Sequence, residues 1–415
     1  MKKRLLLPFL FLAISLSLSA ASAVNVKADE GFDSEENLAL FDFSDETGLN
    51  NDWLDEVTIS LVTQAPGDQV YIWFGHAGLM ISTPDNEIMY DWGVFSFGPG
   101  FYTDFLFGRL YYSTIARWAD SSIMSAAAED RTVRSLTLPL GNAAKRAVID
   151  FVNYNIKREN STYLYHYYLD NCATRIRDII NSASGGAFRT WAESIDTGMS
   201  FRDLSSLYMD RSMFVSFVLN YLQSGEIDQN VSLYDACFLP DVLLRAAAAF
   251  YGVQDTVIYQ GRPEGFTGRS LLAASLVSGL AAAIILYTLA HVSRKAYGIV
   301  SFFFWLFFFI LSSVLLFMMC FTTHDVTWHN ENIIFLNPGI IIFLINAVML
   351  IFSKKAKLDL SISAARVMLT LALSDIVLKG LFPEAFIQDN FSVLAFIIPV
   401  YTALSCLKKE GKRHV

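Results

Sequence analysis

From Ser270 to its end the chain contains five apolar segments of membrane-spanning length, and this feature limits the possible folds most strongly. The segments lie near Ser270–Val292, Gly298–Cys320, Ile333–Phe352, Ile362–Leu381 and Phe391–Leu407. Because about 20 apolar residues cross a bilayer as a helix, we expect residues 263–415 to form an all-α membrane domain of five transmembrane helices. The fourth segment is the weakest, since it contains Arg366, Asp375 and Lys379. Asp375 and Lys379 are spaced for a pair on one helix face.

Basic residues are distributed unevenly between these segments. They follow the first, third and fifth segments, as Arg294, Lys295, Lys354, Lys355, Lys357, Lys408, Lys409, Lys412 and Arg413. The loops Phe321–Asn332 and Phe382–Asn390 contain neither Lys nor Arg. Because Lys and Arg concentrate in cytoplasmic loops, this pattern predicts a cytoplasmic C-terminus and an N-terminal domain on the outer side.

The N-terminus gives the same orientation independently. Met1-Lys2-Lys3-Arg4 is followed by the apolar run LLLPFLFLAISLSLS and then by Ala21-Ser22-Ala23. A basic start, an apolar core and an A-x-A site indicate a signal peptide, here residues 1–23. The alternative is an uncleaved anchor, which the short core and the acidic stretch after it disfavour.

Residues 24–262 are expected to form an exported α+β domain. The sequence predicts a strand at Gln69–Thr83, a turn at Pro84-Asp85-Asn86 and a returning strand at Glu87–Phe97. Further expected elements are a strand at Arg134–Leu140, helices at Ser121–Asp130 and Asn142–Arg158, and a mostly helical Trp191–Phe250. Trp53–Ser60 fits either a helix or a strand. Phe101–Trp118 is aromatic and irregular and can continue the sheet through residues 109–113.

The stretch YLYHYYLDNCATRIRDIINSASGG, residues 163–186, contains a candidate nucleophile. Asp170 or Asn171 can cap a helix whose apolar stripe includes Cys172 and Ile176. Cys172 then lies in the first turn, where free N–H groups and the helix dipole lower the pKa of a thiol. The simpler alternative is a small buried hydrophobic residue, which is how most free cysteines behave.

A histidine and a carboxylate can complete this arrangement. His76 stands in Phe74-Gly75-His76-Ala77-Gly78, on the first strand of the expected hairpin. A turn about Pro84-Asp85 sets residue 76 opposite residue 93, which puts Asp91 diagonally beside His76 on the same face. The sequence thus offers Cys172 as nucleophile, His76 as base and Asp91 as the residue that orients the imidazole. The alternative is a hydrogen-bonded core histidine.

Composition and cysteine usage narrow the function classes. A net charge of −9 disfavours nucleic acid as a partner. No Cys-x-x-Cys pair and no zinc-like His/Cys spacing appear, so we expect neither a metal nor a cofactor. Cys237 is the other cysteine of the exported domain, and a Cys172–Cys237 disulfide, which would abolish a thiol mechanism, is the alternative to a free Cys172.

The order of His76 on a glycine-flanked strand before Cys172 at a helix start is similar to that of circularly permuted papain-like thiol enzymes, NlpC-like and LRAT-like. More closely, the runs FGHAGLMI, YDWGVFSFGPGFYTDFLFGRLYY and YLYHYYLDNCATRIRD resemble the exported domain of the Lnb family of bacterial lipoprotein N-acyltransferases. The run HDVTWHNENIIFLNP and the membrane segments resemble that family more loosely. The chain has His166 where an acid or an amide is expected.

The resemblance implies a multi-pass protein of the bacterial cytoplasmic membrane, with its catalytic domain on the periplasmic side. It implies acyl transfer from a membrane phospholipid, through a thioester on Cys172, to the α-amine of a lipoprotein's N-terminal cysteine. The family's nucleophile and histidine map on Cys172 and His76. Candidate substrate-binding residues are Asn171, Arg175, His324, His329 and Asn332; Arg175 and Asp178 are spaced to pair with each other. The alternatives are a papain-like peptidase or amidase acting on cell-wall peptide, and a non-catalytic membrane scaffold.

Overall fold

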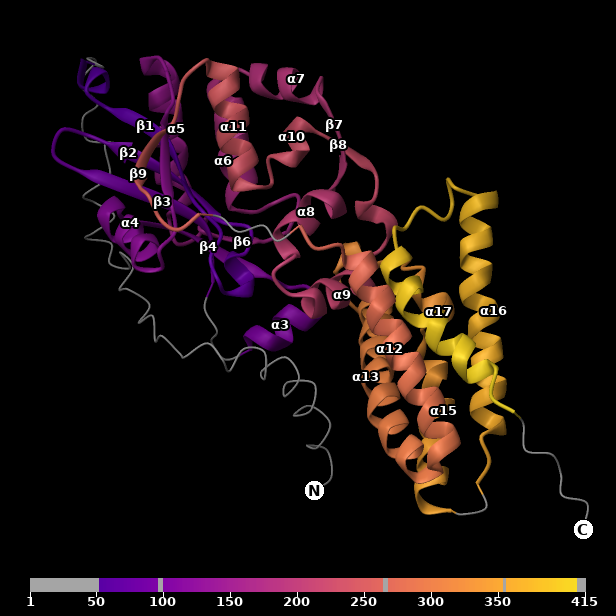
Figure 1. The fold of residues 1–415 in the computed structure, drawn as a ribbon. Helices are drawn as coiled ribbons and strands as arrows, with labels where there is room; N and C mark the ends of the chain where they lie inside the picture. The colour runs from indigo at the N-terminus through magenta and orange to yellow at the C-terminus, as the bar shows by residue number, and fades with distance from the viewer. Residues whose placement is uncertain (1–51, 96–99, 264–267, 354–355, 409–415) are drawn as a thin grey trace, which may run out of the picture. The chain divides into compact units, whose positions relative to one another are not determined.

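The computed structural model describes residues 52–95, 100–263, 268–353 and 356–408 (Figure 1). The expected signal peptide and the acidic segment after it lie outside these residues. The described chain divides into two compact units. One consists of the residues up to Tyr208 together with those from Asn230 to Pro263. The other consists of Met209–Gln229 and the residues from Gly268 onward.

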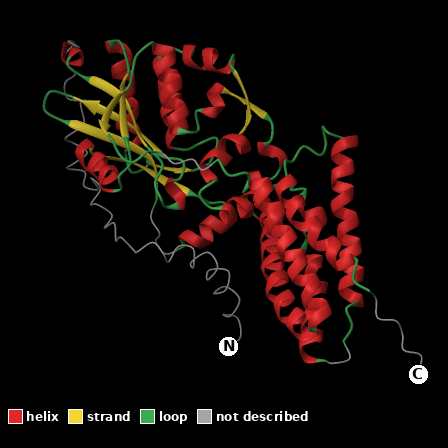
Figure 2. Ribbon diagram, in the orientation of Figure 1, coloured by secondary structure: helices red, strands yellow, loops and turns green. Residues whose placement is uncertain are grey.

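The first unit is built on a seven-stranded antiparallel sheet with the order β6-β4-β3-β2-β1-β5-β9 (Figure 2). Its strands are β1 (Thr58–Gln64), β2 (His76–Ser82), β3 (Glu87–Val94), β4 (Tyr111–Trp118), β5 (Val133–Thr137), β6 (Thr162–Leu164) and β9 (Thr256–Tyr259). A separate two-stranded ribbon pairs β7 (Asp196–Ser200) with β8 (Asn230–Ser232). The fold is therefore α+β, as the sequence predicts.

Helices cover both faces of this sheet. The helices of this unit are α3 (Phe101–Phe107), α4 (Ala119–Ala128), α5 (Asn142–Asn155), α6 (Cys172–Ala183), α7 (Ala187–Glu193), α8 (Phe201–Met209), α10 (Leu233–Ala236) and α11 (Pro240–Tyr251). The main core lies on one face, where the buried side of α6, including Ile176 and Ile180, packs with α5 and α11 against Leu61 and Leu79. On the other face, α4 covers a smaller cluster that includes Met80 and Met89. Alternating apolar positions on each strand produce these two cores.

The predicted hairpin forms with the predicted register. Ser82 pairs with Glu87, Ile81 with Ile88 and Gly78 with Asp91, as a turn about Pro84-Asp85 requires. The first strand is shorter than predicted, because it begins at His76 rather than at Gln69. Gly75, directly before His76, has a φ of +78° and interrupts the extended backbone there, and the residues before it form a short 3₁₀ turn at Val70–Ile72.

Two segments that the sequence left open are also resolved. Residues 53–60 contain both alternatives, since a 3₁₀ helix at Asp52–Asp55 precedes strand β1. The aromatic segment 101–118 contains the helix α3, followed by β4, which extends the sheet as far as Trp118. The predicted helices at 121–130 and 142–158 correspond to α4 and α5.

The second unit is helical. Its helices are α9 (Met213–Leu222), α12 (Leu271–Val292), α13 (Arg294–Phe321), α14 (Asn332–Phe335), α15 (Ile341–Phe352), α16 (Asp359–Leu381) and α17 (Phe391–Ser405). Four segments, Leu271–Val292, Arg294–Phe321, Asn332–Phe352 and Asp359–Leu381, are long and apolar enough to cross a membrane. The fifth expected span is represented by α17, which has 15 residues. At about 1.5 Å per residue it is shorter than a hydrocarbon core of about 30 Å. Four spans are thus supported by length, and a fifth stays a prediction.

Polar side chains are buried at one end of these helices. The predicted Asp375–Lys379 pair has an Oδ2–Nζ distance of 4.0 Å, but Lys379 contacts Glu331 more closely and donates to the Gln388 carbonyl at 2.6 Å. The Gln388 amide in turn donates to the Gln223 carbonyl at 2.8 Å. These bonds help to hold residues 209–229 within the second unit. The sequence predicts one exported domain from 24 to 262, and that boundary stays a prediction.

The location of the C-terminus tests whether α17 crosses the membrane. With five spans and an exported N-terminal domain, a fluorescent protein fused after Val415 is expected to fold in the cytoplasm and fluoresce, and alkaline phosphatase at the same position is expected to be inactive. Four spans would return the C-terminus to the outer side. An active phosphatase fusion after Val415 would therefore contradict the five-span topology.

Candidate active site

Cys172 is the first residue of α6, and the cap before it fixes its position. Asn171 is the N-cap: its Oδ1 accepts hydrogen bonds from the backbone N–H groups of Ala173 and Thr174, both at 2.9 Å. The Thr174 hydroxyl accepts from the Asn171 N–H at 2.7 Å, which completes a capping box. Cys172 is half-buried and packs against the main core. The thiol thus lies in the first helical turn, as predicted.

His76 and Asp91 are brought together by the hairpin. The His76 Nε2 lies 2.8 Å from Oδ1 of Asp91, a fully buried carboxylate. Because Nε2 is engaged by Asp91, Nδ1 is the nitrogen that remains for Cys172, whose thiol interacts electrostatically with the imidazole. The backbone N–H of Ala77, the next residue on β2, also lowers the pKa of the Cys172 thiol. The candidate nucleophile, base and orienting carboxylate therefore form one connected row.

Arg117 is a fourth member of this row that sequence reasoning missed. Its Nε and Nη2 both lie 2.6 Å from Oδ2 of Asp91, the oxygen that His76 does not use. On β4, residue 115 faces Asp91 directly, so Arg117 is a diagonal neighbour. Only the β3–β4 register reveals this contact. That pairing contains a register shift between Asp91 and Val94, which no turn motif in the sequence predicts.

Gly78 provides the space that the Asp91 carboxylate occupies. A Cβ at position 78 would stand 2.8 Å from Oδ1 of Asp91 and 2.7 Å from the sulfur of Met89. Any larger residue would have to displace a fully buried carboxylate. The second glycine of the FGHAG motif is therefore explained by close approach across the hairpin.

The electrostatics of the row favour an ion pair between Cys172 and His76. Burial lowers the pKa of His76, but the neighbouring Cys172 thiolate and the Asp91 hydrogen bond outweigh it and raise that pKa to about 9. Burial raises the pKa of the Cys172 thiol, yet the imidazolium beside it holds this pKa below its ordinary value. Burial also opposes ionisation of Asp91, but Arg117 and His76 lower its pKa to about 2. Asp91 is thus charged at every physiological pH.

The pH dependence of thiol alkylation follows from these shifts. Peptide mass spectrometry after iodoacetamide treatment is expected to show Cys172 reacting with an inflection below about 8.5, the pKa of a free thiol. In His76→Ala the cation is lost while burial and Asp91 remain, so the inflection is expected to rise to about 8.5 or above. An unchanged inflection in the variant would contradict the pairing of Cys172 with His76.

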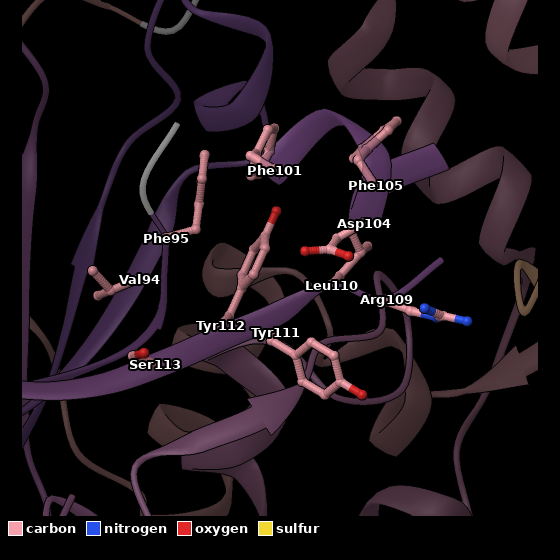
Figure 3. A pocket seen from close by; sticks show the side chains of 10 residues that line it. All are labelled: Val94, Phe95, Phe101, Asp104, Phe105, Arg109, Leu110, Tyr111, Tyr112 and Ser113. Atoms are coloured by element: carbon pink, nitrogen blue, oxygen red, sulfur yellow. The ribbon is translucent and has the colours of Figure 1, made fainter. Parts of the chain in front are cut away.

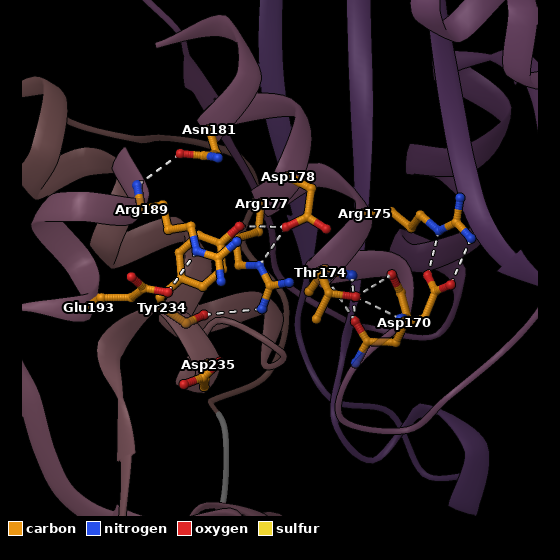
Figure 4. Close-up of polar contacts among 12 residues, drawn as sticks. Asp170, Thr174, Arg175, Arg177, Asp178, Asn181, Arg189, Glu193, Tyr234 and Asp235 are labelled. Atoms are coloured by element: carbon orange, nitrogen blue, oxygen red, sulfur yellow. Dashed lines mark hydrogen bonds and ion pairs between the residues drawn. The ribbon is translucent and has the colours of Figure 1, made fainter. Parts of the chain in front are cut away.

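Two of the predicted substrate-binding residues have structural partners. The Asn171 side chain is used fully, since its amide nitrogen also donates to the Tyr167 and Phe238 carbonyls, each at 2.9 Å. It has no hydrogen-bonding capacity left for a substrate in this conformation. Arg175 pairs with Asp170 in a two-pronged contact (Figure 4), and its guanidinium carbon lies 4.0 Å from the centre of the Tyr163 ring.

The expected Arg175–Asp178 pair is wrong. Helical side chains lean toward the N-terminus, so Arg175 reaches back to Asp170 before the helix. Asp178 instead accepts hydrogen bonds from Arg177 at 2.8 Å and from the Tyr234 hydroxyl at 2.7 Å (Figure 4). His166, also uncertain from the sequence, accepts the backbone N–H groups of Tyr168 and Leu169 through Nδ1 and so stabilises the turn before α6.

The other predicted substrate-binding residues, His324, His329 and Asn332, belong to the second unit. His324 and Asn332 are buried, and Asn332 donates to the Tyr221 carbonyl at 3.0 Å. His329 is exposed, with its Nδ1 3.5 Å from a Glu226 carboxylate oxygen. Asn332 thus has a structural contact within its unit, and contact of these three residues with a substrate stays a prediction.

All four cysteines in the structure are free. Cys237 is buried, and burial raises its pKa to about 12, so it stays a protonated core residue. Within the described ranges, no three His, Cys, Asp or Glu side chains are grouped so that they could bind a metal ion. The described site therefore has the composition of a thiol–imidazole–carboxylate site.

Two family models match the chain, and together they cover both units. Residues 44–206 match the model described as the Lnb N-terminal periplasmic domain, and residues 270–409 match the Lnb transmembrane domain. The first match contains Cys172, His76, Asp91 and Arg117, and the second contains the long apolar helices. No curated protein and no solved structure matches the chain.

Proposed function

We propose, from the premise that this chain belongs to the Lnb family, that it is a lipoprotein N-acyltransferase. Membership indicates a lipoprotein-modifying membrane protein with a periplasmic domain. The finer proposal is that a fatty acyl chain passes from a membrane phospholipid to Cys172 and then to the α-amine of a lipoprotein's N-terminal cysteine. The observation that carries it is the connected row of Cys172, His76 and Asp91 at the start of a capped helix.

In the first half-reaction the Cys172 thiolate attacks the carbonyl carbon of a phospholipid ester. The C–S bond forms, the ester C–O bond breaks, and the imidazolium of His76 gives its proton to the departing lysophospholipid oxygen. Asp91 and Arg117 keep the imidazole in one orientation. A fatty acyl thioester and neutral His76 result.

The developing oxyanion needs donors that the helix cap has not used. The cap engages the N–H groups of Ala173 and Thr174, which leaves the Cys172 N–H as the first-turn donor. The Tyr163 hydroxyl is buried beside the Gly93 backbone N–H, which leaves its own proton to donate, and it lies 3.8 Å from where a Cβ at Gly93 would stand. The Cys172 Cβ lies 3.8 Å from the same point. Tyr163 is thus a second candidate donor.

In the second half-reaction the free α-amine of the lipoprotein attacks the thioester carbonyl. His76 accepts the proton of the attacking amine, the C–S bond breaks, and an amide and the Cys172–His76 ion pair are produced. A membrane domain suits this chemistry, because both substrates remain in the bilayer. Moving an acyl chain through water would cost about 0.8 kcal/mol for each methylene group.

Mass spectrometry of a lipoprotein N-terminus tests the proposal. Cells with this protein are expected to carry an N-terminal cysteine whose amine bears an acyl group, and cells without it a free amine on the same lipoprotein. An identical N-terminal mass in both strains would contradict the assignment. A change confined to cell-wall peptides would favour the peptidase alternative.

A further inference from the structure

An unbroken series of aromatic rings begins beside Cys172. A Cβ at Gly93 would stand 3.8 Å from the Cys172 Cβ and 3.6 Å from the Tyr165 ring, so the three residues meet at one point. Tyr165 stacks on Tyr112 with their ring centroids 4.4 Å apart. The ring planes are tilted by 29°, close enough to parallel to form a continuous apolar wall.

The series continues to the surface helix α3. Tyr112 stacks on Phe95 with centroids 4.8 Å apart, and Phe95 stacks on Phe101 at 5.5 Å. Phe101 lies 6.1 Å from Phe105, one turn further along α3. We call these five rings, Tyr165, Tyr112, Phe95, Phe101 and Phe105, the aromatic path.

A cavity of about 210 Å³ lies along the outer half of the aromatic path. Figure 3 shows Phe95, Phe101 and Tyr112 grouped around it. Two charged residues, Asp104 and Arg109, also line it, and both are exposed: Arg109 points away from the rings, whereas the Asp104 carboxylate points toward Tyr112 (Figure 3). Because both charged residues are exposed, they can stay hydrated at the open side of the cavity while the rings contact an apolar ligand.

Helix α3 exposes apolar side chains where the path reaches the surface. The exposed fractions are 51% for Tyr102, 42% for Phe105 and 36% for Leu106. Adjacent exposed apolar residues on a protein surface commonly mark a lipid or protein contact. Here they adjoin a path that leads to the candidate nucleophile, in a chain that also carries membrane-spanning helices.

We propose that the aromatic path binds the acyl chain of the donor phospholipid, with its carbonyl end at Cys172 and its methyl end at α3. This inference rests on the proposed function. The chain that is transferred has its carbonyl carbon bonded to the Cys172 sulfur, so it must leave the site along a surface that starts there. The acyl chains of the lipoprotein are attached elsewhere on the acceptor and approach with the amine. The path therefore serves the donor chain.

Donor chain length tests this proposal when it is combined with a change at the far end of the path. Single-turnover formation of the Cys172 thioester is measured with butanoyl and palmitoyl phosphatidylethanolamine in mixed micelles. Phe105→Asp is expected to lower the palmitoyl rate by about tenfold or more, since it removes an apolar contact that a long chain reaches. The butanoyl rate is expected to be unchanged, because a short chain ends near Tyr165.

Phe151→Asp is the matched control, since Phe151 is 41% exposed against 42% for Phe105 but lies on α5. It is expected to change neither rate. Equal losses for both donors in Phe105→Asp, or an equal effect of Phe151→Asp, would overturn the proposal. The proposal would also be overturned if Phe105→Asp formed the thioester normally and were slow only in transfer to a diacylated peptide, because the aromatic path would then serve the acceptor.

Photo-crosslinking separates failure of this inference from failure of the proposed function. Full-length Cys172→Ala protein in proteoliposomes is irradiated with phosphatidylethanolamine that carries a diazirine either near the ester or at the end of the acyl chain. The chain-end probe is expected to label the peptide with Phe101–Phe107, and the ester-end probe the peptide with Tyr165. Identical labelling by both probes, or labelling confined to α12–α17, would overturn the aromatic path. A wild-type protein that never forms a thioester would instead contradict the proposed function.

Discussion

Replacement of Cys172 with alanine is expected to abolish lipoprotein acylation, by about a thousandfold or more, while the protein still accumulates in the membrane. The thioester cannot form without the sulfur, and no other described group stands in the same position relative to His76. Because Cys172 is half-buried at a helix start whose cap is supplied by Asn171, its loss leaves the fold intact. The measurement is the acylated fraction of a lipoprotein N-terminus together with the amount of protein.

Cys172→Ser and Cys237→Ala are the matched controls. Serine keeps the size of the side chain but not its acidity, so it is expected to be as inactive as alanine. Cys237 is a buried cysteine of the same unit whose thiol stays protonated, so its alanine variant is expected to retain activity, apart from a loss of stability typical of a small cavity. Full activity in Cys172→Ala would remove every thiol mechanism for this chain.

Asp91→Asn is expected to have the second largest effect, a fall in the rate of thioester formation on the order of 10²- to 10⁴-fold. The substitution keeps the size of the side chain but removes the charge that supports the imidazolium of His76. It also leaves the Arg117 guanidinium without its carboxylate. The pKa of His76, about 9 in the intact row, is expected to fall. The alkaline limit of activity should therefore move to lower pH, which a rate–pH profile measures.

Arg117→Gln separates the effect of the Asp91 charge on His76 from the effect of Arg117 on Asp91. Asp91 keeps its hydrogen bond to His76 in this variant but loses its strongest stabilising charge. Activity is expected to fall less than in Asp91→Asn, and the alkaline limit should stay near that of the wild type. If Asp91→Asn and wild type had the same rate–pH profile, Asp91 would have no role in orienting or charging His76.

How far the sequence predicts the site depends on how far apart its parts lie in the chain. The His76–Asp91 contact was predictable because a short turn fixes the register of a hairpin, and every later pair follows from it. Arg117 was not predictable in the same way. The β3–β4 connection contains a helix, and the pairing shifts register between Asp91 and Val94, so the diagonal partner of Asp91 cannot be found by counting residues.

Helix α3 and the cap of α6 show two further limits. The α3 sequence FYTDFLF is dominated by aromatic residues and contains one strong helix former, Leu106, so its aromatic content obscured a helix bounded by Gly100 and Gly108. Asn171 was identified correctly as a possible cap, but a sequence does not show that a cap consumes all of its hydrogen bonds. The second case depends on a tertiary contact, the hydrogen bond from Asn171 to the Phe238 carbonyl.

In the membrane unit, too, the local elements are predictable from the sequence and the long-range contacts are not. Long apolar segments are visible in any sequence, and four of them are helices of spanning length. The inclusion of residues 209–229 in that unit depends on hydrogen bonds such as those from Asn332 and Gln388 to backbone carbonyls of that segment. No periodicity encodes these bonds, so the sequence alone does not indicate that this segment packs with the helical unit.

The most direct test of the central claim is intact mass spectrometry of the full-length protein after brief exposure to a palmitoyl phospholipid without a lipoprotein acceptor. We expect a mass increase of one palmitoyl group that maps to Cys172, is released by neutral hydroxylamine as a thioester is, and disappears when a peptide with a free N-terminal lipidated cysteine is added. A protein that acylates its lipoprotein while Cys172 never carries a fatty acyl group would contradict the account.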